Sequence, residues 1–200
     1  METLSTLITF NCSEKIDFLM KIVLSLAPDS RNSFSNLLFS CAFRRKLYLY
    51  YFSCTGTTEK VANAIVEVTG GKPYKITPAD PYTSADLNWK DKNSRSSREM
   101  SDEQSRPVLS GDVLNVKDYD IVFLGYPIWW NLCPRPINTF IEKYDFSGKT
   151  IIPFATSGSS SITNSIKYLK KLYPQIKWGE GKLLNNGTGQ AKDWAKQIIK

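Results

Sequence analysis

The sequence predicts an α/β domain in which helices cover both faces of a parallel β-sheet. From residue 46 onward, short apolar runs alternate with stretches whose apolar residues recur at helical spacing. The apolar runs are continuous rather than alternating, which is typical of strands buried on both faces. Strands and helices that alternate along the chain are joined by right-handed crossovers. The sequence therefore predicts a three-layer α/β sandwich.

The strands are expected where apolar, β-branched and aromatic residues cluster: at 47–52, 73–77, 120–125, 150–155 and 176–184. The helices are expected where one face is apolar: at 59–68, 136–143, 161–172 and 191–198. Ligands of such sheets bind beyond the carboxyl ends of the strands. We therefore expect the site in the loops that follow Phe52, Gly125 and Ala155.

Residues 78–111 interrupt this alternation with a long, polar stretch rich in Asp, Ser and Arg. A loop of this length inside a compact domain is often functional. The sequence leaves two roles open. The segment either caps the site or only replaces a crossover helix.

Residues 1–45 do not share the alternating pattern of the rest of the chain, and we interpret them as an N-terminal extension of unknown role before a domain at 46–200. Apolar positions between Ile16 and Ala27 fit an amphipathic helix that ends before Pro28. Acidic residues precede this run and no small-residue cleavage site comes after it, which argues against a signal peptide. No apolar run reaches the roughly 18 residues of a membrane span. The predicted location is the cytoplasm.

The composition excludes several kinds of chemistry. The chain has no histidine, so Ser-His-Asp catalysis, Cys-His catalysis and histidine-based metal sites are ruled out. The four cysteines are widely spaced and form no CxxC pair, which favours a reducing compartment. Residues 160–200 carry eight lysines against two acidic residues, a pattern that favours solvated faces over a nucleic-acid partner. No catalytic or metal-binding residue is assigned.

The first of the three loops, residues 53–58, combines hydroxyl side chains with a glycine at the start of a helix. Hydroxyls donate hydrogen bonds without adding charge, and the N–H groups of a helix start point toward an anion. Tyr51 adds a fifth hydroxyl to those of the loop. The pattern predicts a site for a phosphate monoester that is held by neutral donors.

Two rival phosphate motifs are absent from the sequence. No GxxxxGK[ST] string of a Walker loop exists. A cysteine-based phosphatase would need an arginine six positions after its cysteine, but Lys60 stands there relative to Cys54. Lysine lacks the planar fork that clamps a phosphoryl group. We therefore interpret Cys54 as a small loop residue.

The second and third loops are suited to an aromatic ligand. Trp129 and Trp130 come shortly after a proline at the end of a strand, and two tryptophans at a sheet edge are costly unless something covers them. A flat heteroaromatic ring could stack on either one. Residues 156–161 form a small, hydroxyl-rich loop whose backbone can approach a polar ligand edge.

Three segments together resemble the flavodoxin-like family, in particular its shorter bacterial members. YFSCTGTTEKVANAI resembles the FMN phosphate loop and first helix. DIVFLGYPIWW resembles the third strand and the loop beside the flavin, and DFSGKTIIPFATSGSS the fourth strand and third flavin loop. The resemblance begins at Lys46. It implies non-covalent FMN and a five-stranded parallel sheet in the order 2-1-3-4-5.

The resemblance also implies a role for each matching residue. The phosphate would be held by Ser53, Thr55, Gly56, Thr57 and Thr58. The isoalloxazine ring would be bordered by Pro127, Ile128, Trp129 and Trp130, and its pyrimidine edge by Ser157, Gly158 and Ser159. The third loop lacks the aromatic residue with which many flavodoxins cover the second ring face, so one face is expected to be open.

These observations lead to three hypotheses for the function. The leading one is a redox protein that passes electrons or a hydride through FMN, including NAD(P)H- or quinone-linked oxidoreductases. The alternatives are a flavodoxin that only carries electrons and a non-catalytic binding module that keeps the fold. Whether the chain is itself an enzyme is left open. The expected partner is a redox protein or a small-molecule electron donor or acceptor, and the sequence does not decide whether the chain forms a homodimer.

Overall fold

The computed structural model describes residues 47–111, 116 and 119–199. The extension at 1–45, with its expected helix at 16–27, lies outside these residues. The central strands are β1 (Leu47–Tyr51), β5 (Ile121–Pro127) and β6 (Thr150–Thr156), with β2 (Lys72–Lys75) beside β1. All their pairings are parallel, and with β7 (Lys177–Trp178) at the far edge the sheet order is β2-β1-β5-β6-β7. Counted by position along the chain this is 2-1-3-4-5, so the expected topology is confirmed.

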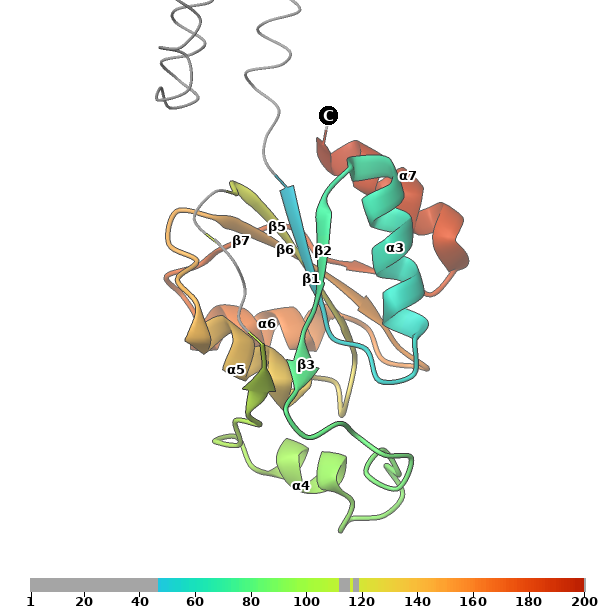
Figure 1. The fold of residues 1–200 in the computed structure, drawn as a ribbon, viewed down its shortest axis with the longest axis vertical. Helices are drawn as coiled ribbons and strands as arrows, with labels where there is room; N and C mark the ends of the chain where they lie inside the picture. Colours follow the sequence, from blue (N-terminus) through green and yellow to red (C-terminus); the bar gives the residue numbers. More distant parts are fainter. Residues whose placement is uncertain (1–46, 112–115, 117–118, 200) are drawn as a thin grey trace, which may run out of the picture. The chain divides into compact units, whose positions relative to one another are not determined.

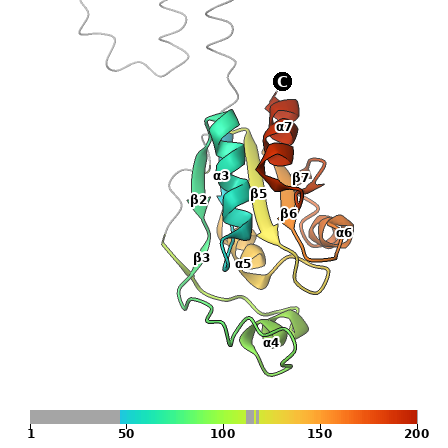
Figure 2. The same ribbon diagram turned by 90° about the vertical axis from the view of Figure 1, so that its right-hand side faces the viewer.

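Two pairs of helices cover the sheet, one pair on each face (Figure 1). One face carries α3 (Thr57–Thr69) and α7 (Gly187–Ile199). The other carries α5 (Arg135–Lys143) and α6 (Thr163–Leu172), as the view in Figure 2 also shows. The three-layer α/β sandwich is therefore confirmed. In the part of the chain that the structure describes, no helix combines the length and the apolar character that a membrane crossing requires.

The first strand shows why its apolar run is continuous. Its residues are all buried, and successive side chains point to opposite faces. Tyr48 and Tyr50 join the core cluster that contains Phe140 of α5. Leu49 and its neighbours two residues away join the cluster that contains Ile65 of α3. A strand covered on both faces cannot place a polar residue on either side without burying it.

The expected last strand at 176–184 is wrong as a continuous element. The structure has β7 (Lys177–Trp178) and β8 (Lys182–Leu183), which pair with different parts of β6. On this edge of β6, the carbonyl groups of Ile151 and Ala155 accept hydrogen bonds from the Gly179 and Leu184 N–H groups, at 2.8 Å each. Pro153 lies between them on the same edge and has no N–H to donate. The ladder therefore breaks at the proline.

Residues 78–111 are also more ordered than the expected loop. They contain α4 (Arg95–Ser101), and the antiparallel pair of β3 (Thr77–Pro78) and β4 (Leu109–Ser110) closes the segment at its base. Ser94 provides the N-cap of α4 by accepting a hydrogen bond from the Ser97 N–H. In Figures 1 and 2, α4 lies beyond the carboxyl ends of the strands rather than against a face of the sheet. We call residues 79–107 the cap segment.

Candidate functional site

A pocket of about 650 Å³ opens at the carboxyl edge of the sheet, where the loops after β1, β5 and β6 meet. Every residue predicted for the site lines this pocket except Gly56. None of its lining residues is charged. Its lining residues are Ser53, Cys54, Thr55, Thr57, Thr58, Leu87, Trp89, Ser96, Pro127, Ile128, Trp129, Trp130, Ser157, Gly158, Ser159 and Ser160.

The first loop folds back on itself before α3 begins. The Ser53 hydroxyl accepts a hydrogen bond from the Gly56 N–H at 3.1 Å. Gly56 has a φ of 84°, a left-handed conformation that residues with a Cβ rarely adopt. The hydroxyls of Thr55 and Thr57 lie 3.4 Å apart on the exposed side of the loop. Gly56 thus turns the chain without lining the pocket, while the threonines beside it line the pocket.

The start of α3 is arranged to receive an anion. Gly56 is its N-cap residue and no side chain caps the helix, so the leading N–H groups keep their hydrogen-bonding capacity. Glu59 in the first turn does not compete for them, because it accepts hydrogen bonds from Lys75 at 3.0 Å and from the Tyr51 hydroxyl at 2.9 Å. These bonds hold the pKa of the Glu59 carboxyl below its usual range. The Tyr51 hydroxyl, which the sequence suggested as a donor of the loop, is used in this contact.

Thr58 connects the first loop to the end of β6. Its hydroxyl lies 2.9 Å from the Thr156 hydroxyl, and both residues are buried. This contact fixes α3 against the third loop. Thr58 therefore contributes to the pocket wall with a hydroxyl that is already paired inside the protein.

The second loop is a tight turn that places its two tryptophans differently. Trp129 and Leu132 exchange both backbone hydrogen bonds, at 3.0 and 2.9 Å. The two residues between them, Trp130 and Asn131, have φ values of 44° and 64°, as a type I′ turn requires. Trp129 is half-buried against the edge of Phe52, whereas 46% of Trp130 is exposed. Of the two tryptophans, Trp130 offers the freer aromatic surface.

The third loop is held by a residue that the sequence analysis missed. Asn185 follows β8, and its side-chain oxygen accepts from the Ser157 N–H at 2.9 Å. Its amide nitrogen donates to the Ser157 carbonyl at 2.7 Å. The Ser157 hydroxyl in turn accepts from the N–H groups of Ser159 and Ser160. Asn185 stands at the carboxyl end of the last strand, so the rule that located the other loops could have found it.

A neighbouring pocket of about 530 Å³ shares part of the same loops. It adds Lys60 from α3 and Thr188 from the start of α7 to residues such as Thr55 and Ser157. Lys60 is exposed and lies in the wall of this neighbouring pocket. The larger pocket depends on neutral donors and on the field of the α3 N-terminus for any negative charge that it receives.

The cap segment supplies a wall that the sequence did not assign. Leu87, Trp89 and Ser96 line the larger pocket. Of the two roles left open for this segment, the structure places it at the site. No periodic pattern marks these residues, and their place depends on contacts between distant parts of the chain.

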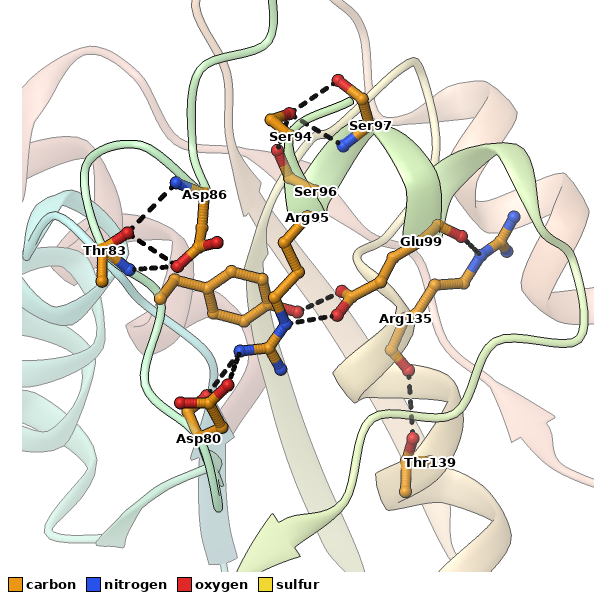
Figure 3. Close-up of polar contacts among 11 residues, drawn as sticks. Asp80, Thr83, Asp86, Ser94, Arg95, Ser96, Ser97, Glu99, Arg135 and Thr139 are labelled. Atoms are coloured by element: carbon orange, nitrogen blue, oxygen red, sulfur yellow. Dashed lines mark hydrogen bonds and ion pairs between the residues drawn. The ribbon is translucent and has the colours of Figure 1, made fainter. Parts of the chain in front are cut away.

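A cluster of polar contacts around Arg95 holds the cap segment together internally (Figure 3). Arg95 makes ion pairs with Glu99 at 2.7 Å and with Asp80 at 3.1 Å. Its guanidinium lies 4.2 Å from the centre of the Tyr82 ring, and the Tyr82 hydroxyl donates to Glu99. Burial and the Glu99 carboxylate raise the pKa of Tyr82 well above its ordinary value. The Tyr82 ring also meets the edge of Trp129, with 5.4 Å between centroids, and so joins the cap segment to the second loop.

Arg135 holds the other end of α4. It is 1% exposed and donates to the carbonyls of Glu99 and Met100 at 3.1 and 3.0 Å. These carbonyls belong to the last turn of α4, where the helix dipole favours a positive charge. Its remaining amino group donates to the Tyr168 hydroxyl of α6 at 2.6 Å. One buried cation thus connects the cap segment, α5 and α6.

The fold and the pocket together define a doubly wound α/β protein with a ligand site at the carboxyl edge of its sheet. The site joins a phosphate-type loop to an aromatic loop. The model of the flavodoxin family matches residues 46–198, and the chain belongs to this family.

Two crystal structures of candidate flavoproteins are similar to this chain in sequence as well as fold. The Bacteroides uniformis protein is 54% identical to this chain. The match covers 76% of this chain and 98% of the Bacteroides uniformis chain, with a TM-score of 0.74. The Bacteroides eggerthii protein is 50% identical. That match covers 78% of this chain and 99% of the Bacteroides eggerthii chain, also with a TM-score of 0.74. A Lactobacillus acidophilus flavoprotein in complex with FMN shares the fold at 17% identity, with 76% and 99% coverage and a TM-score of 0.61. No curated protein matches the sequence.

Proposed function

We propose that the domain at residues 46–200 binds FMN in the larger pocket and passes electrons or a hydride through it. The observation that carries the proposal is the uncapped start of α3 beside an uncharged, hydroxyl-lined pocket with tryptophans in its wall. A phosphate monoester suits the helix start, and a flat ring suits the aromatic wall. The FMN complex of the Lactobacillus acidophilus flavoprotein, which shares the fold, supports the choice of cofactor.

Each part of the pocket then has one task. The phosphate would be bound by the N–H groups at the start of α3 and by the exposed hydroxyls of the first loop. Pro127, Ile128, Trp129 and Trp130 would border the ring, and Ser157, Gly158 and Ser159 would meet its pyrimidine edge. Bound FMN supplies the one- or two-electron chemistry, and the protein binds and orients it. No protein base is needed, which agrees with a chain without histidine.

The phosphate assignment can be tested by comparing FMN with riboflavin, which lacks the phosphate. The purified full-length chain should show flavin absorbance bands after incubation with FMN and washing. Thr57→Val keeps the shape of an exposed side chain but removes its hydroxyl. Because a hydrogen bond to a charged group is worth about 1.5–3 kcal/mol, we expect the Kd for FMN to rise roughly tenfold or more. The Kd for riboflavin should stay the same.

Thr163→Val is the matched control, since Thr163 is exposed at the start of α6 and does not line the pocket. A wild-type protein that loses its flavin on washing would contradict the proposed function and favour a binding module that keeps only the fold. Equal effects of Thr57→Val on FMN and riboflavin would contradict the phosphate assignment.

Whether this flavoprotein is an oxidoreductase or an electron carrier depends on its reaction with small donors. We propose that a redox protein or a small-molecule donor or acceptor is the partner. Steady-state oxidation of NADH or NADPH by the FMN-loaded protein separates the two. Turnover with a quinone or another acceptor supports an oxidoreductase, and no turnover with any acceptor supports a carrier.

A further inference from the structure

The larger pocket has aromatic residues in two walls that come from distant parts of the chain. Trp129 and Trp130 belong to the loop between β5 and α5. Trp89 belongs to the cap segment, which lies beyond the carboxyl ends of the strands (Figure 2). The third loop contributes serines and a glycine but no ring. The sequence predicts the aromatic wall formed by Trp129 and Trp130. The structure adds a second aromatic wall, formed by Trp89, that the sequence analysis did not predict.

Trp89 is 68% exposed, which is a high value for so large an apolar side chain. Beside the same pocket, 46% of Trp130 is exposed. Two exposed tryptophans around one pocket leave apolar surface in contact with water, and such surfaces commonly mark a binding site. A flat aromatic ligand between them would remove this surface from water and offer a stacking partner to each.

Trp89 lies in a folded part of the cap segment. The Asn88 N–H donates to the Ala85 carbonyl at 3.2 Å, and the Asp91 N–H donates to the Asn88 carbonyl at 3.0 Å. The Ser97 hydroxyl donates to the Asp91 carbonyl at 2.7 Å, which joins this turn to α4. With the Arg95 cluster at the start of α4, these bonds fold the backbone on both sides of Trp89 into one unit, which the Tyr82 ring joins to Trp129 of the second loop.

We infer that Trp89 covers the face of the flavin ring that the third loop leaves open. The inference rests on the proposed function, because it takes FMN as the occupant of the pocket. The cap segment then supplies the second aromatic partner from a different place in the chain.

The experiment measures the Kd for FMN of the full-length chain with three variants. Trp89→Ala should raise the Kd roughly tenfold, since an aromatic stack adds to the burial of the ring. Trp89→Phe keeps a smaller ring and should stay within about threefold of the wild type. Val108→Ala is the control, because Val108 is 73% exposed just after the same segment and does not line the pocket. Its Kd should equal that of the wild type.

A second experiment tests whether the Arg95 cluster positions Trp89. Arg95→Ala should weaken FMN binding when Trp89 is present and have little further effect when Trp89 is already alanine. Such non-additivity is the mark of two residues that act as one unit. Independent effects of the two substitutions would contradict the role of the cluster in placing Trp89.

The failure of this inference can be told apart from that of the proposed function. If the wild type binds no FMN, the proposed function fails and the role of Trp89 fails with it. If the wild type, Trp89→Ala and Val108→Ala all bind FMN equally, only the inference is overturned. Circular dichroism of each variant should match the wild type, because the Trp89 and Val108 side chains are exposed and support no core.

Discussion

Trp130 combines an unfavourable backbone conformation with an exposed aromatic side chain. Its φ of 44° lies in the left-handed region, where a residue with a Cβ is strained by about 1–2 kcal/mol. Asn131 beside it has a φ of 64°, which asparagine tolerates better. Strain of this kind persists only where the surroundings impose it, and it is common at ligand sites. The turn keeps a tryptophan at the pocket although asparagine or glycine would fit its backbone better.

At the residue scale, we predict that Trp130→Asn stabilises the protein without its flavin and weakens FMN binding. The free energy of unfolding should rise by about 1 kcal/mol, because asparagine accepts the left-handed conformation more easily. The Kd for FMN should rise because the ring is lost. Urea unfolding and flavin titration measure the two effects.

Trp130→Ala is the control for this prediction, since alanine removes the ring but keeps the strain of the left-handed turn. It should weaken FMN binding to a similar extent and bring no gain in stability. Equal stability of the asparagine and alanine variants would show that the turn is not strained.

Among the elements, β5 and β6 pack so closely that one position tolerates only glycine. A Cβ at Gly125 of β5 would overlap the ring of Phe154, its partner in the parallel ladder. Phe154 is itself fully buried, against Trp194 of α7. The ring fills the space that the glycine leaves, so the two residues act as a pair.

At the element scale, Gly125→Ala should lower the free energy of unfolding by about 2–3 kcal/mol, because overpacking in a tight core forces side chains to shift. In the background of Phe154→Leu the same substitution should cost much less, since leucine leaves room for the methyl group. Chemical denaturation of the two single variants and the double variant measures this coupling.

Gly189→Ala is a matched control for this cycle. Gly189 lies in α7, and a Cβ there would meet nothing within 4 Å. Alanine should leave the stability unchanged or raise it by up to about 1 kcal/mol, because it favours the helix. An equal cost of Gly125→Ala in both Phe154 backgrounds would refute the proposed clash.

Across the whole molecule, buried tyrosines make the fold sensitive to alkali. Burial is the main cause that raises the pKa of Tyr50, Tyr82, Tyr126 and Tyr173 above the ordinary value. Tyr50 differs from the others in that its buried hydroxyl lacks a hydrogen-bond partner among the described residues. In the unfolded chain these hydroxyls regain a pKa of about 10.

We predict that the ionisation of these tyrosines leaves the free energy of unfolding unchanged below about pH 10 and lowers it above that pH. Above that pH the unfolded chain loses phenolic protons that the folded protein retains, so alkali favours unfolding. Between its unfolded and its folded pKa, each such tyrosine lowers the free energy of unfolding by about 1.4 kcal/mol per pH unit. Urea unfolding at about pH 8 and about pH 11 measures the loss, and Tyr126→Phe should reduce its slope. A stability that does not change over this range would contradict the prediction.

Local patterns were enough to predict most of the sheet and three of the loops. Period and composition are properties of neighbouring residues, so the runs at 47–52 and 120–125 predicted buried strands. The carboxyl-edge rule then directed attention to the loops that line the larger pocket. The expected strand order came from the family resemblance and not from the pattern itself.

By itself, the sequence determined the α/β sandwich, the order of its elements and the loops that meet at its carboxyl edge, because these depend on local periodicity and on general rules of chain connection. Only the tertiary structure decided how Pro153 divides the last strand, how Asn185 holds the third loop and where the cap segment lies. Each of these depends on side chains that are far apart in sequence. Arg95 and Arg135 read as ordinary charges in the sequence, and their partners become apparent only when the chain is folded.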